Sequence, residues 1–486
     1  MTAEARRRII DYIDARFDEE VRFLAELVKM PSDNPPGDCA AHAEGTAKLM
    51  EGLGFAVERH VVPQATVEAA GMITATNLVA RRAYGAVDAR EFASILRGLD
   101  TKQYKILEML VRPQGATASE MTAAGLDDVS VRTYAKQIAA QCGLDYREIK
   151  EGRGARYWIY RAGPVIALNA HGDVVPPGEG WTADPYGAEI RDGWMYGRGA
   201  AVSKSDFATY AFATLALEQA GVPLKGGIEI HGTYDEEVGG DIGPRWLIEQ
   251  GISRPDLAIA AGFSYSVVTA HNGVLHLEAV IDGKSAHAAI PFTGIDALEA
   301  ANGIMSALYA FRRSLATKVS EITGIGSPQL TLGLIKGGIN TNVVPDRVTI
   351  RMDRRMIPEE NPAEVEAELR AVMEGAAKAY PGIRLTVNRI LLARPLVPLP
   401  GSERLAEALV RHAGDIMGER VETKGVPLYT DARHYAAAGI PIVLYGAGPR
   451  TITEANAHRA DERLPIEDLR RATKVVALAL LDLLAQ

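Results

Sequence analysis

Apolar residues follow two different spacings along the chain, and each spacing predicts a type of element. Ile9, Ile13 and Phe17 recur every four positions near the start, with charged residues between them, which predicts an amphipathic helix. From residue 161 onward, short apolar runs such as 164–170 and 226–234 alternate with longer helical patterns. Strands that alternate with helices predict an α/β domain with a mostly parallel sheet, whose site lies at the carboxyl ends of the strands.

The pattern changes in the middle of the chain. Residues 268–392 carry two helical patterns among about four strand patterns, which predicts a small α+β, ferredoxin-like domain with antiparallel strands. The alternation of strand and helix then resumes and continues to the end. We therefore expect one domain made of residues 1–83, 161–267 and 393–486, interrupted by a second domain at 268–392.

A further segment, residues 84–160, interrupts the first domain between two strand patterns that would otherwise be almost continuous. Three short helical patterns precede a hairpin-like pair of strands, an order that resembles a winged helix. Many winged helices bind DNA through a basic face. This segment has 11 Lys and Arg residues against 10 Asp and Glu residues, so a packing or oligomerisation insert is favoured over a DNA-binding one.

Composition and charge narrow the classes of function. The 486 residues are 47% apolar and 24% charged, as in ordinary globular proteins, and the formal net charge is −9. A negative molecule is repelled by nucleic acids and anionic membranes, so neither is an expected partner. Cys39 and Cys142 are too few for a disulfide framework, and no apolar stretch has the length of a signal peptide or membrane span. A cytoplasmic location is expected.

Three groups of polar residues follow apolar strand patterns and could carry chemistry. They are His171 with Asp173, Glu236 with Glu237 before a pair of glycines, and His458 after a glycine turn. Taken singly, each group is more simply a loop histidine, a solvated pair of acids or a surface histidine. All three follow core strands of one expected sheet, so they can converge at its edge, which indicates a metal-dependent hydrolytic site.

Seven short motifs occur in an order that resembles a known enzyme family. They are HGDVVP (171–176), YGRGAAVSKSD (196–206), TYDEEVGG (233–240), GKSAHAAIP (283–291), NVVPD (342–346), TDAR (430–433) and ANAH (455–458). The chain resembles the family of acetylornithine deacetylase, succinyl-diaminopimelate desuccinylase and glutamate carboxypeptidase, everywhere except residues 84–160. This resemblance implies a zinc-peptidase-like catalytic domain split by a small dimerisation or lid domain.

The resemblance also implies roles for residues of the first domain. His171, Glu237 and His458 would bind the metal, Asp173 would orient His171, and Glu236 would act as general base. In the second domain, His287 would stabilise the developing oxyanion, acting from the other subunit of a homodimer or larger homo-oligomer.

Two further residues of the second domain are expected to contact the substrate. Asn342 and Arg355 occupy positions at which the family often binds a small-molecule substrate, commonly through its carboxylate.

Two positions depart from the family pattern. The family holds two metal ions, bridged by an aspartate where this chain has Val202, and a second acidic ligand aligns with Gly262. With Glu237 as the one remaining carboxylate ligand, a second divalent ion would be poorly compensated, so one ion per chain is expected. Asp206 could substitute for the missing bridge, although an acid in the first turn of a helix is the simpler interpretation. Imidazole and carboxylate ligands accommodate zinc, manganese or cobalt.

Three functions follow from these observations. The first is a metal-dependent hydrolase that cleaves a non-internal C–N bond, as a deacylase or carboxypeptidase does, with a metal-activated water and Glu236 as general base. The second is an aminohydrolase that releases ammonia from an aromatic amine such as a nitroanthranilate, at a site with one metal. The third is a non-catalytic binding protein derived from the family.

His231, which lies on a strand, is expected to be a core histidine whose ring nitrogens find hydrogen-bond partners, and not a metal ligand.

Overall fold

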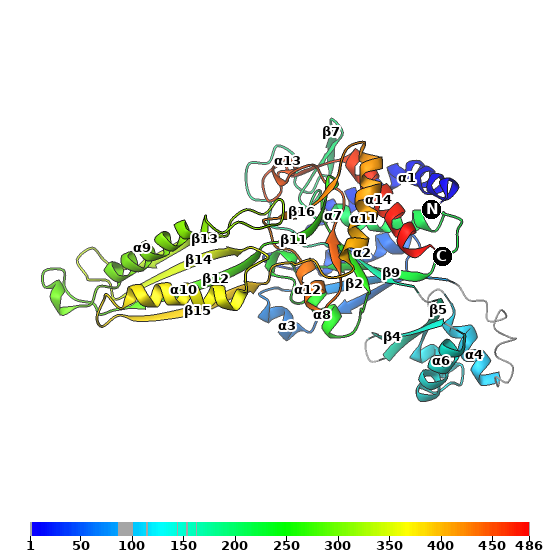
Figure 1. Cartoon of the computed structure of the whole chain (residues 1–486), viewed down its shortest axis with the longest axis horizontal. Helices are drawn as coiled ribbons and strands as arrows, with labels where there is room; N and C mark the ends of the chain where they lie inside the picture. Colours follow the sequence, from blue (N-terminus) through cyan, green and yellow to red (C-terminus); the bar gives the residue numbers. More distant parts are fainter. Residues whose placement is uncertain are drawn as a thin grey trace. The chain divides into compact units, whose positions relative to one another are not determined.

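The structure, a computed structural model, describes residues 2–85, 101–112, 115–142, 144–151, 154–161 and 163–485. The chain divides into two units (Figure 1). The first unit comprises Met1–Val267, Pro398–Thr423 and His434–Gln486, and the second comprises Val268–Val397 and Lys424–Arg433.

An eight-stranded sheet forms the centre of the first unit. Its four middle strands are parallel neighbours, and the antiparallel strand β2 flanks them. In spatial order the strands are β1 (Val57–Val61), β2 (Thr76–Tyr84), β9 (Gly226–Thr233), β6 (Val165–His171), β10 (Leu257–Ala260), β17 (Ile442–Leu444), β11 (Ser266–His271) and β16 (Glu422–Val426). The predicted α/β class with a mixed, mostly parallel sheet is confirmed.

One helix of the first unit is buried along its whole length. Every residue of α7 (Lys204–Leu217) is buried, because the helix lies between the sheet and other helices and most of its sequence after Asp206 is apolar. Two long helices pack against it, α1 (Ala3–Lys29) and α14 (Ile466–Leu484), and α11 (Ser402–Met417) packs against α14 (Figure 1). Within the described residues, no helix has the length and apolarity needed to cross a membrane.

Shorter elements complete the first unit and support its loops. A three-stranded sheet has the order β18 (Arg463–Pro465), β8 (Trp194–Tyr196) and β7 (Glu189–Arg191). The remaining helices are α2 (Ala40–Gly52), α3 (Gln64–Ala69), α8 (Pro244–Glu249), α12 (Ala432–Ala437), α13 (Ile452–Ala455) and the single 3-10 turn η2 (Glu236–Val238).

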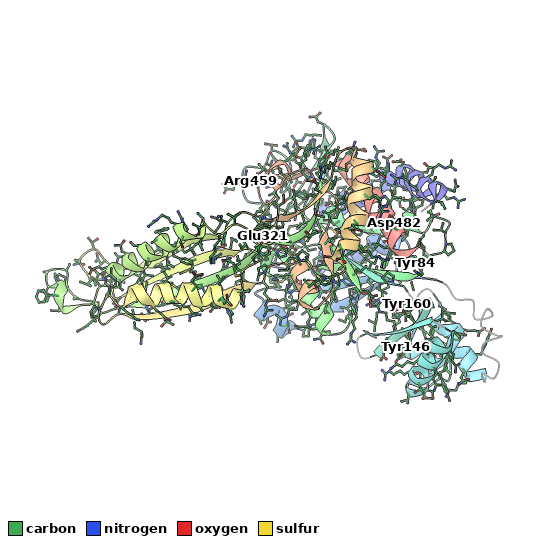
Figure 2. The ribbon with its side chains drawn as sticks, in the orientation of Figure 1. Tyr84, Tyr146, Tyr160, Glu321, Arg459 and Asp482 are labelled. Atoms are coloured by element: carbon green, nitrogen blue, oxygen red, sulfur yellow. The ribbon has the colours of Figure 1, made fainter. Side chains whose placement is uncertain are left out.

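The insert has a hydrophobic core of its own. Its helices are α4 (Thr101–Leu110), α5 (Ala118–Ala123) and α6 (Asp128–Cys142), and its strands are β3 (Ala116–Thr117), β4 (Leu144–Glu151) and β5 (Gly154–Arg161). Three helices followed by a hairpin is the order that the sequence predicts. Thr117 and Glu120 form a capping box that begins α5. Figure 2 labels Tyr84 and Tyr160 at the two ends of the insert; residues 86–100 lie outside the described residues.

The second unit is a four-stranded antiparallel sheet with two helices. The chain order is β12 (Gly273–Asp282), α9 (Ala297–Leu315), β13 (Gln329–Gly337), β14 (Arg347–Met356), α10 (Pro362–Ala377) and β15 (Arg384–Ala393). A short 3-10 turn, η3 (Pro291–Thr293), precedes α9. The spatial strand order is β13-β14-β12-β15, as in ferredoxin-like domains. Residues of β12 alternate between buried and half-buried because one face packs on the helices.

A buried glutamate between α1 and α14 makes the stability of the first unit depend on pH. Glu20 is fully buried, and its Oε1 accepts a hydrogen bond from the Thr473 hydroxyl. Burial raises the pKa of Glu20 from 4.5 to about 8, although Thr473 and the nearby Arg470 oppose this shift. The unfolded chain releases this proton near pH 4.5 and the folded chain holds it to about pH 8, so stability falls as the pH rises between these values.

We therefore expect Glu20→Gln to be more stable than the wild type at pH 8 by roughly 2 to 5 kcal/mol, and close to it at pH 4.5. Urea unfolding at the two pH values measures the difference. Asp18→Asn, at an exposed position of the same helix, is the matched control. An equal effect of Glu20→Gln at both pH values would contradict a buried, neutral carboxyl.

Candidate active site

The candidate site lies where two neighbouring parallel strands end. His171 is the last residue of β6 and pairs in register with Thr233, the last residue of β9. Beyond the strands the Gly172 N–H donates to the Thr233 carbonyl at 2.8 Å, which keeps the two loops together. A Cβ atom on Gly172 would lie 2.4 Å from the ring of Tyr234, so this approach requires glycine. The two loops therefore deliver their side chains to one edge of the sheet.

The carboxylate of Asp173 connects the loop after β6 to the loop after β9. Asp173 is completely buried; its Oδ1 accepts the Glu236 N–H at 3.3 Å, and its Oδ2 accepts the Glu237 N–H at 3.2 Å. The Asn34 side-chain amide donates to Oδ2 at 3.0 Å. His171 Nδ1 lies 3.0 Å from the Asp173 carbonyl oxygen and 3.5 Å from Oδ1. The Asp173 residue thus contacts the imidazole and both acidic residues that the sequence singles out.

The loop after β9 holds Glu236 and Glu237 in a single tight turn. Asp235 is buried and its Oδ2 accepts the Ile242 N–H at 2.7 Å. The turn ends at Gly239, whose φ of 125° other residues rarely adopt. His434 on α12 contacts the Gly239 carbonyl through Nε2 at 2.9 Å. These contacts fix both ends of the turn that carries the two glutamates.

His458 approaches the site from the loop after α13. Its Nε2 lies 3.4 Å from Glu237 Oε1, and the nearby carboxylate raises the pKa of His458. The Glu237 side chain is only 7% exposed, whereas that of His458 is 56% exposed. The structure therefore brings His458 and Glu237 into contact, with His458 the more exposed of the two.

The electrostatics of the site favour a cation. Burial alone would lower the pKa of His171, but the carboxylates of Asp173, Glu236 and Glu237 raise it well above its usual value. Two ligands of a tetrahedral metal with bonds of about 2.1 Å are about 3.4 Å apart, which is the separation of His458 and Glu237. His458 and Glu237 thus lie at the separation of two ligands of one divalent ion, although no three candidate ligand side chains already meet at ligand distances in the described part of the chain.

The structure leaves no room for the second acidic ligand of the family. A Cβ atom on Gly262 would lie 2.8 Å from the Tyr445 backbone nitrogen, so the chain passes too close for any side chain there. The half-buried Val202 supplies only its N–H, which donates to Glu462 at 3.3 Å. Asp206 is buried in the first turn of α7, accepts the Ala447 N–H at 3.2 Å, and has a pKa well above the usual value because of burial.

A buried ion pair connects the loop before α7 with the loop of His458. Arg198 Nη1 donates to Glu462 Oε2 at 2.6 Å, and both side chains are almost fully buried. The other Glu462 oxygen accepts the Ala201 N–H at 3.2 Å, while Arg198 donates to the Arg459 carbonyl. Because an uncompensated buried charge is costly, the pair holds the two loops in one arrangement.

The predicted residues of the second unit fall into two places. His287 is exposed and pairs with Val343 in an isolated bridge, and the Ala288 N–H donates to the Asn342 carbonyl at 3.0 Å, so His287 and Asn342 are neighbours. Arg355 lies near the far end of β14, where its guanidinium pairs with Asp353 at 2.9 Å. The structure therefore brings His287 and Asn342 together and does not bring Arg355 to them.

Two contributors are not identified by sequence reasoning. Asn34 supports Asp173 but precedes two prolines, which resembles an ordinary turn. His434 directly follows the TDAR motif, and this adjacency is the one signal that could have drawn attention to it.

Comparisons with known proteins show which proteins the chain resembles. Residues 167–482 match the model of peptidase family M20/M25/M40. A succinyl-diaminopimelate desuccinylase of Wolinella succinogenes is 26% identical over 372 residues, 72% of this chain and 96% of that protein. An acetylornithine deacetylase of Myxococcus xanthus is 29% identical over 318 residues, 65% of this chain and 79% of that protein.

Solved structures show the same fold. The aminopeptidase PepT of Bacillus cereus has a TM-score of 0.62 at 20% identity, with 96% of this chain and 99% of that chain covered. The YXEP protein of Bacillus subtilis, described as a dinuclear metal-binding peptidase, has a TM-score of 0.58 at 17% identity and coverages of 97% and 99%.

Proposed function

The chain belongs to peptidase family M20/M25/M40 and is a metal-dependent hydrolase, and from this premise we propose that it cleaves the amide bond of an N-acyl amino acid or dipeptide-like substrate. One observation carries the proposal. The buried Asp173 carboxylate contacts His171 and the N–H groups of Glu236 and Glu237, which supports a role for His171 and Glu237 as metal ligands beside Glu236 as general base. The relatives named as desuccinylase and deacetylase support a deacylase that acts on a terminal rather than an internal amide.

The side chains divide the work between them. A bound divalent ion supplies Lewis acidity, which makes a water molecule more acidic and polarises a carbonyl group. His171, Glu237 and His458 would hold the ion, and Asp173 keeps the His171 ring oriented through Nδ1. Glu236 would take the proton of the attacking water and pass it to the leaving nitrogen.

The second unit would complete the site in a homodimer. His287 would stabilise the oxyanion from the partner subunit, and Asn342 and Arg355 would bind the substrate. For Arg355 this requires that it leave its ion pair with Asp353.

The two missing ligand positions favour a site with one ion, of zinc, manganese or cobalt. They also support a second candidate, an aminohydrolase that releases ammonia from an aromatic amine such as a nitroanthranilate. With Val202 and Gly262 unable to ligate, Glu237 would be the single carboxylate on the metal.

Because Cys39 and Cys142 are both unpaired, we place the enzyme in the cytoplasm.

Replacement of Glu236 by glutamine tests the reaction. Removing a general base lowers kcat by about 10²- to 10⁴-fold, so Glu236→Gln should lose activity while its metal content stays unchanged. The assay uses N-succinyl and N-acetyl amino acids and dipeptides, with free amino acid as the product. Asp241→Asn, an exposed change near the same loop, is the control. Ammonia release from an aromatic amine, with no amide cleaved, would favour the aminohydrolase instead.

Metal content tests the single-ion site. Protein purified without chelators or a metal-binding tag should contain about one ion per chain, and His458→Ala should lose it without unfolding, because His458 is more than half exposed. Asp173→Asn should keep the site but bind the ion about 10- to 100-fold more weakly, since an amide cannot accept all the N–H groups that face it. His276→Ala, in the second unit, is the control. Two ions per chain would contradict the proposal.

An exposed apolar edge strand supports the proposed homodimer. Leu334 and Ile335 on β13 are 62% and 53% exposed, and β13 is an edge of its sheet. Leu334→Asp should therefore yield a monomer by analytical ultracentrifugation, whereas Thr331→Asp, an exposed change on the same strand, should weaken the dimer less. A wild-type monomer at micromolar concentration would contradict the proposal.

A further inference from the structure

A line of buried polar side chains runs along one face of β9, the strand that leads to the two glutamates. Glu229, His231 and Thr233 are spaced two residues apart, so they share one face, and all three are almost completely buried. On the opposite face, Ile228 and Ile230 belong to the apolar core. Burying polar groups in the middle of a sheet is costly unless each finds a partner, so the contacts of these side chains matter.

Glu229 and His231 form the centre of the line. Burial would raise the pKa of Glu229, but Arg81, His231 and Arg147 lower it below its usual value, so the carboxylate is ionised and can only accept hydrogen bonds. His231 Nε2, 3.3 Å from Glu229 Oε2, must therefore carry the proton. His231 Nδ1 lies 2.7 Å from the Tyr435 hydroxyl, within hydrogen-bond distance. The imidazole therefore bridges Glu229 and Tyr435.

Tyr435 continues the line to the catalytic loop. Its ring stacks on that of His231 at 6.0 Å between centroids and an angle of 16°. The preceding residue on α12, His434, contacts the carbonyl of Gly239, the residue that ends the turn of Glu236 and Glu237. A displacement of α12 would therefore move the end of that turn.

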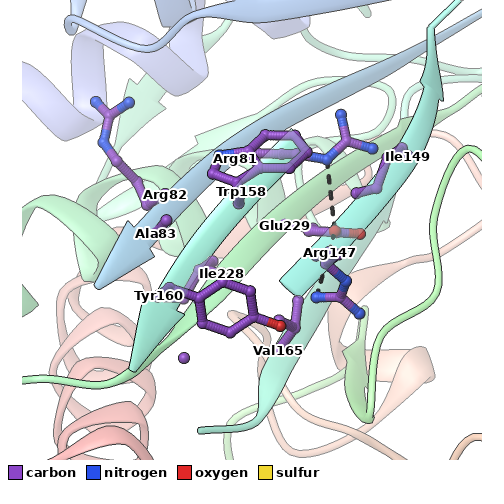
Figure 3. Close-up of a pocket in the computed structure, with 12 residues that line it drawn as sticks. Arg81, Arg82, Ala83, Arg147, Ile149, Trp158, Tyr160, Val165, Ile228 and Glu229 are labelled. Carbon is purple, nitrogen blue, oxygen red and sulfur yellow. Dashed lines mark hydrogen bonds and ion pairs between the residues drawn. The ribbon is translucent and has the colours of Figure 1, made fainter. Parts of the chain in front are cut away.

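The other end of the line meets the insert. Arg147 on β4 places Nη1 4.0 Å from Glu229 Oε1, and its Nη2 donates to the Arg254 carbonyl. Figure 3 shows Arg147 and Arg81 on either side of Glu229, in a small cavity that Trp158 of the insert also lines. Arg147 thus brings a charge of the insert to the buried carboxylate.

The way the insert joins the sheet strengthens this contact. It leaves the chain after β2 and returns before β6, and these two strands are the two neighbours of β9. Tyr84 pairs with Gly226 and Val165 with Gly227, at the start of β9, whereas the catalytic loop follows its end. The insert is thus attached to one end of the strand whose other end carries the glutamates.

We infer that docking of the winged-helix-like insert sets the conformation of the catalytic loop 235–240, with Glu229, His231 and Tyr435 as the positioning residues that connect Arg147 to it. The insert is then a control module for the hydrolase rather than a DNA-binding domain. The connection does not depend on which amide bond is cleaved. Hydrogen exchange can measure it without a substrate, so an enzyme inactive on every amide would leave it open to test.

The experiment compares backbone hydrogen exchange of the full chain by mass spectrometry, in peptides that cover 234–243. Arg147→Gln removes the charge beside Glu229, so these amides should exchange about three- to tenfold faster than in the wild type. Arg147→Lys, which retains a charge, should restore most of the protection. Arg132→Gln, which breaks the ion pair with Glu148 elsewhere in the insert, should leave 234–243 unchanged.

A second variant separates the connection from a general loss of stability. Tyr435→Phe removes the hydroxyl that lies beside His231 Nδ1, and in this background Arg147→Gln should have no further effect on 234–243. Exchange in α7 should stay at the wild-type rate in all variants. The inference is overturned if Arg147→Gln changes exchange only in 144–161 and 226–231, or if the two substitutions act additively on 234–243.

Discussion

The active-site arrangement depends on one buried carboxylate that is surrounded by hydrogen-bond donors. Asp173 accepts the N–H groups of Glu236 and Glu237 and the amide of Asn34, and it lies beside the His171 ring. A buried carboxylate is stable only when its oxygens accept hydrogen bonds, so the folded chain keeps each of these groups in contact with Asp173. One residue thereby fixes two proposed metal ligands and the proposed general base at once, which is how a loop can supply a precise site.

Much of this site could be predicted from the sequence because the sheet topology brings the predicted residues to one edge. His171 and the pair Glu236 and Glu237 follow apolar strand patterns, and parallel strands end at a common edge, so their convergence follows from the fold class. Asn34 and His434 could not be found in this way, because they act through a side-chain amide and a backbone carbonyl across 139 and 195 residues of chain. Nor does a sequence pattern show that Gly262 has no space for a side chain, which only the approach of Tyr445 reveals.

Charge explains both the two missing ligand positions and the contacts that the buried acids of the first unit make. Two divalent ions need several carboxylates nearby, whereas Asp206 here has a raised pKa and accepts a backbone N–H instead. Glu462 is also taken up, by Arg198 and two backbone groups. The acids near the second position are thus engaged in holding the chain, so a site with one ion agrees with both the absent side chains and the uses of those that remain.

The polar face of β9 connects the buried charges of the first unit to the insert. An apolar face would stabilise the sheet at a lower desolvation cost, since a buried ion pair seldom stabilises a protein more than well-packed apolar side chains do. Glu229 is satisfied only while Arg81, Ser253, His231 and Arg147 all stay in place, and one of these four comes from the insert. A change in the position of the insert therefore first alters the ion pairs and hydrogen bonds of Glu229. Because His231 contacts both Glu229 and Tyr435, that change passes to Tyr435 and to the helix that supports the catalytic turn.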